Sequence, residues 1–399
     1  MINWDDLEAA NEPINAFTKF DRKAEFGEGP LDNMTIGVKS NIAVEGLPWT
    51  GGIGAYRDRI ASKDAEVVKR LRDAGAAIVG TLNMEEAALG AKTDNPFFGA
   101  TQNPHKIGYT PGGSSGGSGA AVAAGLCDVA LGTDTMGSVR VPAAYCGVYG
   151  LKPSRGSVSQ NGLELCEPML DTIGPLARSL EELEACSRIM MDFSAPQVIE
   201  NIVLLDNLGE VECEPAVLDA YERVKLTLGA QTAFSLPYPL TRVRFAGFIL
   251  SSLALANSLS SIIKKNPDGL SDHLKHLMTY GPKRLAVDLA EDRNILERVK
   301  EALVSAVGEH GAILLPTTPQ AAFSHDDIAP ANQADFTCLA SIAGLPAITI
   351  PAGWNDAGLP VGVQLIGAAG NEAGLFGLAR KLDEKLDAYR RPETFLEIS

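Results

Sequence analysis

The serines of the glycine-rich segment 110–137 are the residues of this sequence best suited to nucleophilic chemistry. The segment reads TPGGSSGGSGAAVAAGLCDVALGTDTMG, and G-x-S-x-G, the pattern of a strand-to-helix nucleophile turn, occurs twice in it, at Ser114 and Ser115. That pattern needs a histidine base, yet none of the five histidines, at 105, 273, 276, 310 and 325, lies in a motif-like setting. A segment so rich in Gly and Ser matches G-x-S-x-G through its composition alone, so a Ser–His–Asp triad is disfavoured.

Two other interpretations of the segment also fit poorly. A flexible linker would not alternate with apolar stretches that must be buried. A phosphate-binding loop would need G-x-x-x-x-G-K-[ST], which does not occur there. Glycines between core elements allow close approach of backbones, so the segment predicts a tightly packed site rich in backbone N–H donors. Its serines are the candidate nucleophiles, and a base must come from elsewhere in the chain.

The elements around this segment predict an α/β protein. Residues 34–44 and 76–83 are short apolar runs typical of buried strands, and 64–75 has the apolar spacing of an amphipathic helix with a glycine stop. Within the glycine-rich segment, 119–125 predicts a tightly packed alanine-rich helix followed by a buried strand. The stretch 138–153, SVRVPAAYCGVYGLKP, is strand-like.

The second half of the chain is less regular. Helical periodicity recurs over 179–192 and 283–310, whereas 194–245 is weakly patterned and interrupted by Pro237 and Pro239. We expect a peripheral, mainly helical layer over about 214–310. Three short apolar strands then return the chain to the central sheet, at 311–319, 345–353 and 359–367.

Lys39 lies inside the first apolar strand and is the candidate base. A serine hydroxyl becomes a useful nucleophile only when a base removes its proton, and a lysine can do so only when it is neutral. Desolvation in a buried strand would lower the lysine pKa in the required direction. Taken alone, a lysine in a strand more often extends its ammonium to solvent, so this role depends on the serine motifs.

The combination of motifs resembles the amidase signature family of serine hydrolases. The resemblance rests on PGGSSGGSGAAVAAG (111–125), ALGTDTMGSVRVPAAYCGVYGLKP (130–153) and GVKSNIAVEGLP (37–48), and it extends to DTIGPLARS, GLPAITIPAG and GLPVGVQLIG further along the chain. It implies an α/β/α fold with a mixed central β-sheet flanked by helices. One amidase domain would cover 1–399, with its catalytic core at about 30–192 and 311–370.

The resemblance also implies a catalytic triad. Ser138, in TMGSVR, would be the acyl-accepting nucleophile, Ser114 the bridging serine and Lys39 the base. The peptide bond from Gly113 to Ser114 would be cis, which is rare away from proline.

The family's oxyanion hole maps onto the backbone N–H groups of Thr135, Met136, Gly137 and Ser138. The sequence departs from the family at Met136, where glycine is usual, and at Ser40, where aspartate is common. Methionine could be strained at a glycine position, and its side chain could narrow the acyl pocket.

Three further residues could support the site. Two of them have two possible roles, and the third has one. Arg140 could orient a substrate carboxylate or brace the loop, and Ser115 could assist the proton relay or cap the alanine-rich helix. Asp134 is expected to accept hydrogen bonds from the same loop. Neither the histidines nor the cysteines have metal-ligand spacing, so no metal site and no cofactor are expected.

Charge and cysteine usage limit the partners and the compartment. With 34 Lys and Arg against 50 Asp and Glu, the net charge of −16 disfavours nucleic-acid binding, leaving room only for a local patch on a tRNA-binding partner. Six scattered cysteines without a CxxC pair indicate reduced thiols in a cytoplasmic protein. The apolar stretch 246–263 contains five serines and an asparagine, which favours a buried or homodimer-interface helix over a membrane span.

The sequence therefore predicts a hydrolase of small-molecule amides with a Ser138–Ser114–Lys39 relay and a possible side activity on esters or carbamates. Two related activities stay open: a hydrolase of allophanate or carboxybiuret, and a glutaminase subunit of a tRNA-dependent amidotransferase. A catalytically silent scaffold is the non-enzymatic alternative. The identity of the amide is not encoded in any motif.

Overall fold

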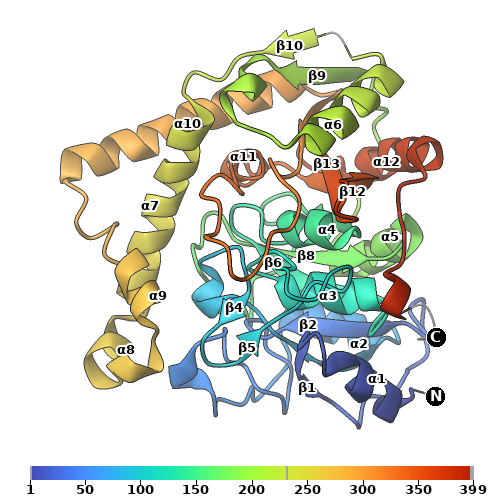
Figure 1. Cartoon of the computed structure of the whole chain (residues 1–399), viewed down its shortest axis with the longest axis vertical. Helices are drawn as coiled ribbons and strands as arrows, with labels where there is room; N and C mark the ends of the chain where they lie inside the picture. Colours follow the sequence, from blue (N-terminus) through green and yellow to red (C-terminus); the bar gives the residue numbers. More distant parts are fainter. Residues whose placement is uncertain (1, 231, 396–399) are drawn as a thin grey trace.

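A mixed eleven-stranded sheet forms the centre of the molecule (Figure 1). The computed structural model describes residues 2–230 and 232–395. The strands follow the order β1-β3-β2-β6-β8-β7-β12-β13-β11-β9-β10 across the sheet. Their bounds are β1 (Phe17–Phe20), β2 (Thr35–Lys39), β3 (Ala77–Leu82), β6 (Val129–Asp134), β7 (Tyr149–Lys152), β8 (Thr172–Ala177), β9 (Asn201–Leu205), β10 (Thr232–Phe234), β11 (Gly311–Pro316), β12 (Ala347–Trp354) and β13 (Pro360–Gly367). A separate pair consists of β4 (Asp94–Asn95) and β5 (Gly99–Ala100).

Helices cover both faces of this sheet. The α-helices of the described chain are α1 (Trp4–Asn11), α2 (Glu66–Asp73), α3 (Gly116–Ala124), α4 (Arg140–Cys146), α5 (Leu180–Met190), α6 (Pro215–Leu228), α7 (Leu240–Ser258), α8 (Ser260–Lys265), α9 (Asp272–Leu277), α10 (Ala286–Val307), α11 (Cys338–Ala343) and α12 (Glu372–Leu386). On one face α2, α5, α6 and α12 pack against the strands, and on the other lie α3, α4, α11 and α10. The predicted α/β/α fold is confirmed.

Alternation of side chains along the strands explains the two layers. In β11, Ala312 and Leu314 join one apolar cluster while Ile313 and Leu315 join another, because successive residues of a strand point to opposite faces. The strand pairing is mixed: β2 runs parallel to β3 and β6, whereas β8 runs antiparallel to both β6 and β7. Both faces are covered, which accounts for the fully buried strands.

Helix α3 is built from small residues so that it can lie against the strands and α4. It begins at Gly116, three residues before the predicted start, and every residue from Gly116 to Ala124 is buried. A Cβ on Gly117 would lie 2.4 Å from the Asn83 carbonyl oxygen, and one on Gly119 would lie 3.0 Å from Pro142 of α4. Larger residues at these positions would push the helix away from the elements that carry the site.

The strand-like prediction for 138–153 is wrong over its first half. Residues Arg140–Cys146 form α4, and only Tyr149–Lys152 form a strand. Valine and tyrosine favoured the strand interpretation, but Pro142 stands in the first turn of the helix, where a missing N–H costs nothing. Gly147 then ends the helix with a left-handed φ of 66°.

The weakly patterned segment 194–245 is also more ordered than its sequence indicates. It contains β9, β10 and the 14-residue helix α6, which starts at Pro215, ends at Leu228 and is followed by Gly229 with φ 63°. Because α6 packs directly on β11, β12 and β13, this part of the expected peripheral layer belongs to the central structure. Proline at the first helical position and glycine after the last were the overlooked signals.

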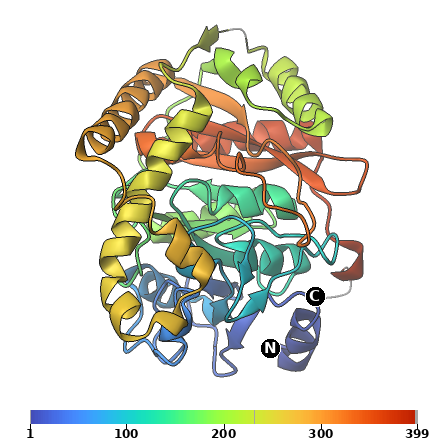
Figure 2. The same ribbon diagram turned by 60° about the vertical axis from the view of Figure 1, so that its left-hand side comes forward.

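The apolar stretch 246–263 falls on α7 and α8. Helix α7 buries one side, including Ala246, Ile249 and Leu255, and packs against α10 and α11. Figures 1 and 2 show α7, α9 and α10 as an outer layer along one side of the molecule. Within the described part of the chain, no helix combines the length and apolarity that crossing a bilayer would require.

Candidate active site

Lys39 ends β2 in a fully buried position surrounded by hydroxyl groups. Its Nζ lies 2.8 Å from each of three oxygens, Ser114 Oγ, Ser115 Oγ and Thr133 Oγ1. Burial lowers the pKa of Lys39 to about 7, and the Asp171 carboxylate opposes that shift. The lysine does not extend to solvent. Its amine is therefore neutral in a large fraction of molecules near pH 7, as a general base requires.

The hydroxyl groups around Lys39 are not equivalent. Ser115 Oγ donates to the Thr133 carbonyl oxygen and accepts from the Thr133 N–H, each at 3.2 Å. Its proton is thus engaged, and its side chain makes no capping bond at the start of α3, so the expectation of a cap is not met. Ser114 Oγ has no partner besides Lys39 among the described residues, which leaves its proton free to move.

A network of backbone contacts holds the loop that carries Ser114. The Gly113–Ser114 peptide bond is cis, as the resemblance implied. Thr93 Oγ1 donates to the Gly112 carbonyl at 2.7 Å and accepts from the Gly116 N–H at 3.1 Å, tying the loop at both ends. A Cβ on Gly113 would lie 2.9 Å from Ala91 Cα, so the neighbouring chain leaves no room for a side chain.

Ser138 lies in the turn between β6 and α4. Its residue is 8% exposed and lines a cavity of about 280 Å³. The turn is anchored to the Ser114 loop because the Ser115 N–H donates to the Ser138 carbonyl oxygen at 3.2 Å. Ser138 Oγ itself makes no hydrogen bond within the described residues, so the contact with Ser114 that a relay needs is not formed in this structure. Catalytic hydrogen bonds often tighten only when substrate is bound.

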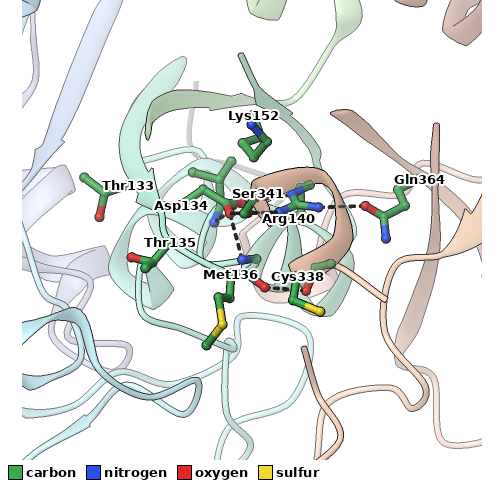
Figure 3. Close-up of polar contacts among 12 residues, drawn as sticks. Thr133, Asp134, Thr135, Met136, Arg140, Lys152, Cys338, Ser341 and Gln364 are labelled. Carbon is green, nitrogen blue, oxygen red and sulfur yellow. Dashed lines mark hydrogen bonds and ion pairs between the residues drawn. The ribbon is translucent and has the colours of Figure 1, made fainter. Parts of the chain in front are cut away.

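The carboxylate of Asp134 organises this turn (Figure 3). It accepts from the backbone N–H groups of Gly137, at 2.7 Å, and Val139, at 3.2 Å. Burial acts to raise the pKa of Asp134, but the Arg140 guanidinium outweighs it and holds that pKa below its usual value. The expectation that Asp134 accepts bonds from the loop is confirmed.

These hydrogen bonds to Asp134 reduce the number of N–H groups available to the predicted oxyanion hole. Because the Gly137 N–H already donates to Asp134, it is not free for a substrate oxygen. The N–H groups of Thr135, Met136 and Ser138 donate to no protein acceptor among the described residues. These three remain the available donors.

Met136 fits its position without backbone strain. Its φ lies outside the left-handed region, so the glycine usual in the family is not required here. Its side chain lines the cavity, as expected of a residue that narrows the pocket. Gly137 is the residue with the unusual backbone, at φ 136°, and a Cβ there would lie 2.1 Å from Thr337 Oγ1.

Arg140 braces the turn and does not face the cavity. Its side chain is fully buried, donates from Nε and Nη2 to Asp134 at 3.0 and 2.8 Å, and reaches Gln364 and Ser341 (Figure 3). Since every one of its guanidinium nitrogens has a protein partner, the alternative in which Arg140 orients a substrate carboxylate is wrong.

The structure adds two residues that the sequence analysis did not name. Thr133, on β6, supplies the third hydroxyl around Lys39 and also accepts from Asn41. Asp171 accepts from Thr135 Oγ1 at 2.6 Å, and burial raises the pKa of Asp171 to about 6. Asp171 lies in DTIGPLARS, which carried the resemblance without an assigned role. A threonine facing the lysine on the neighbouring strand was the signal for Thr133.

Residues remote in sequence complete the cavity. It is lined by the segment 88–91, by Gly113 and the turn 135–138, by Arg244, Phe248 and Ser251 of α7, and by the segment 329–334. All six cysteines are free thiols, and Cys166 lines this cavity. Across the described residues, no group of His, Cys, Asp and Glu is arranged to hold a metal ion.

Comparison with known proteins identifies the family. The model of the amidase family matches residues 7–376 of the chain. The chain belongs to the amidase family. The resemblance of its motifs to amidase signature enzymes is thereby confirmed over nearly the whole sequence.

Relatives of this amidase include components of larger assemblies. A glutamyl-tRNA(Gln) amidotransferase subunit from an Exiguobacterium species is 30% identical, covering 98% of this chain and 94% of its own length. The corresponding protein from Thermotoga maritima has a solved structure with a TM-score of 0.85 at 26% identity, covering 98% and 93%. A chain from the solved structure of a vestigial protein complex, described as revealing the evolutionary origins of an s-triazine catabolic enzyme, has a TM-score of 0.88 at 28% identity. The match covers 97% of this chain and 96% of that chain.

Proposed function

We propose that this amidase cleaves the carbon–nitrogen bond of a small amide through an acyl-enzyme on Ser138. The observation that carries the proposal is the buried Lys39 amine, with a pKa near 7, bonded to a Ser114 hydroxyl whose proton is free. Neutral Lys39 takes the proton of Ser114, which takes the proton of Ser138 as Ser138 Oγ attacks the carbonyl carbon. The free N–H groups of Thr135, Met136 and Ser138 receive the oxyanion.

The remaining steps return Lys39 and Ser114 to their starting protonation states. Collapse of the tetrahedral intermediate breaks the C–N bond, and the proton held by Lys39 passes back through Ser114 to the leaving nitrogen. Water then attacks the acyl ester with the relay acting as base. The expelled group is Ser138 Oγ, which regains a proton as the acid is released. No cofactor enters the scheme.

Intact-protein mass after a panel of amides tests this proposal. Wild type is expected to gain the mass of an acyl group from a substrate that it turns over, and Ser138→Ala is expected to gain none. Ser118→Ala is the matched control, since Ser118 Oγ is buried on the neighbouring helix and bonds only to the Leu131 carbonyl. An adduct that persists in Ser138→Ala, or turnover unchanged by that substitution, would contradict the proposal.

The second candidate function is the glutaminase component of an amidotransferase. The names of the curated relatives favour it, and each of those relatives is one subunit of an assembly. We therefore propose that partner proteins take part if L-glutamine is the substrate that forms the acyl-enzyme. Glutamine hydrolysis that appears only with a co-purified partner and ATP would select this candidate. Turnover of another amide by the isolated chain would select the small-molecule amidase, whose panel includes carboxylated ureas, esters and carbamates.

A homodimer and a silent scaffold remain to be tested by simple experiments. The mass of the protein in solution decides the oligomeric state. Covalent labelling of Ser138 by a fluorophosphonate would eliminate the scaffold, because only an activated serine reacts with that reagent.

A further inference from the structure

Arg244 is the one charged residue among those that line the cavity in the described structure. It lies on the second turn of α7, and the other lining residues are mostly small or apolar, among them Ala88, Val141 and Ala331. No carboxylate lines the cavity in this part of the chain. A guanidinium in a small apolar cavity is costly unless it has a partner of opposite charge, and Asp335 is that partner for Arg244.

One edge of the Arg244 guanidinium is occupied and the other is free. Its Nε donates to Asp335 Oδ1, and Asp335 is fully buried behind it. Nη1 and Nη2 have no hydrogen-bond partner in the described residues, yet they are not among the nitrogens sealed inside the protein. These two nitrogens are therefore partly accessible, and they belong to a residue that lines the cavity. Asp335 fixes the plane of the guanidinium and leaves an edge with two parallel N–H donors.

A second donor lies on another residue that lines the same cavity. Tyr145 OH accepts from Gln320 Nε2 at 2.8 Å and donates to Gln333 Oε1 at 3.2 Å. This chain fixes the orientation of the Gln333 amide, so its Nε2 is the end without a protein partner. Gln333 lines the cavity as Arg244 does. Among the described residues, the side-chain groups of Arg244 and Gln333 that lack a protein partner are thus donors, one of them charged.

We propose that Arg244 binds a carboxylate of the substrate, so that this enzyme acts on small amides that also carry an acid group. Two parallel N–H donors match the two oxygens of a carboxylate, a pairing stronger than single neutral hydrogen bonds. The cavity volume of about 280 Å³ lies at the lower end of ligand pockets, which suits a metabolite-sized substrate. The proposal rests on the proposed amidase function, since it places the amide at Ser138.

The negative net charge of the protein makes a local cation more important for binding an acidic substrate. At −16 the molecule as a whole repels anions, so affinity for an acid must come from a specific contact. Arg244 lies on α7, outside the motifs that carry the chemistry. It is a specificity residue and has no part in the proton relay.

Arg242 offers a matched control on the same helix. It lies two residues before Arg244, donates to the fully buried Asp292 at 2.6 Å, and is absent from the cavity lining. Arg242→Gln and Arg244→Gln therefore each break one ion pair to a buried aspartate. Only Arg244→Gln removes a cation from the cavity.

Paired substrates test the proposal. The kcat/KM of wild type is measured for the monoamides of succinate and glutarate and for neutral amides of equal carbon number. Wild type is expected to prefer the acids, and Arg244→Gln to lose on the order of 100-fold for the acids but less than about threefold for the neutral amides. Arg242→Gln should leave the preference unchanged. Equal turnover of both classes by wild type, or equal loss of both in Arg244→Gln, would overturn the proposal.

Binding separates this inference from the proposed function. Calorimetry with the monoamide of glutarate uses Ser138→Ala, alone and combined with Arg244→Gln. Binding that disappears in the double variant supports the carboxylate contact even if wild type turns over nothing, in which case only the hydrolytic proposal falls. Turnover of neutral amides without binding of the acid would contradict the proposed carboxylate contact but would still support the proposed amidase function.

Discussion

The turn that carries Ser138 and the helix α7 across the cavity from it are built in opposite ways. In the turn, the Asp134 carboxylate accepts hydrogen bonds from the Gly137 and Val139 N–H groups, and Gly137 has no room for a side chain. Helix α7 presents long side chains, Arg244 and Phe248, to the same cavity. The contacts around Gly137 leave no room for a substitution, whereas the side chains of α7 can be exchanged. Chemistry is therefore concentrated in the rigid wall and substrate choice in the adaptable one.

Removal of the base should give the largest effect on the reaction rate, because it abolishes the chemistry without changing the shape of the turn that carries Ser138. Lys39→Met keeps the length of the side chain but removes the amine, and we expect kcat to fall at least about 10⁴-fold. In wild type, kcat/KM should rise about tenfold per pH unit below pH 7 and level off above it, because the neutral amine is the active form. Rate measurements from pH 5 to 9 check both expectations; a flat profile would contradict the role of Lys39.

A methyl group at Gly137 should give the next largest effect. Gly137→Ala places a Cβ 2.1 Å from Thr337 Oγ1 and at an unfavourable φ, so the turn must shift and misplace the oxyanion donors. Loss of such a donor costs about 10²–10³ in kcat. The thermal midpoint distinguishes a shifted turn from a protein that no longer folds. Near-normal kcat in Gly137→Ala would show that the turn is adaptable after all, which removes the contrast with α7.

A methyl group in α7 should give the smallest effect. Gly247→Ala would bring a Cβ 2.7 Å from Met136 Sδ, the far end of a flexible side chain that can move aside. Since Met136 lines the cavity, we expect a change of a few-fold in KM with kcat nearly constant. Steady-state kinetics on one substrate suffice. A fall in kcat as large as that of Gly137→Ala would show that α7 takes part in the chemistry.

The same contrast explains what the sequence could predict. Glycines and serines at fixed spacing are visible because the rigid wall has few permissible residues, and the family resemblance that they carry implied the fold, the cis bond and the roles of Lys39 and Ser138. Arg244 and Gln333 were missed because an arginine on an amphipathic helix looks like any surface residue. The helix at 140–146 was missed because its packing against β12 and β13 overrides the strand preference of its valine and tyrosine.

The hydrogen bonds to Asp134 should also give neighbouring backbone amides different rates of hydrogen exchange with solvent. The amide hydrogens of Gly137 and Val139 are held by a buried carboxylate and should exchange slowly, on the timescale of opening of the whole turn. Those of Thr135, Met136 and Ser138 have no acceptor in the described part of the chain and belong to residues that line the cavity, so they should exchange fast. An inhibitor that mimics the oxyanion would slow these three alone. The turn thus carries its own internal reference for reporting when the site is occupied.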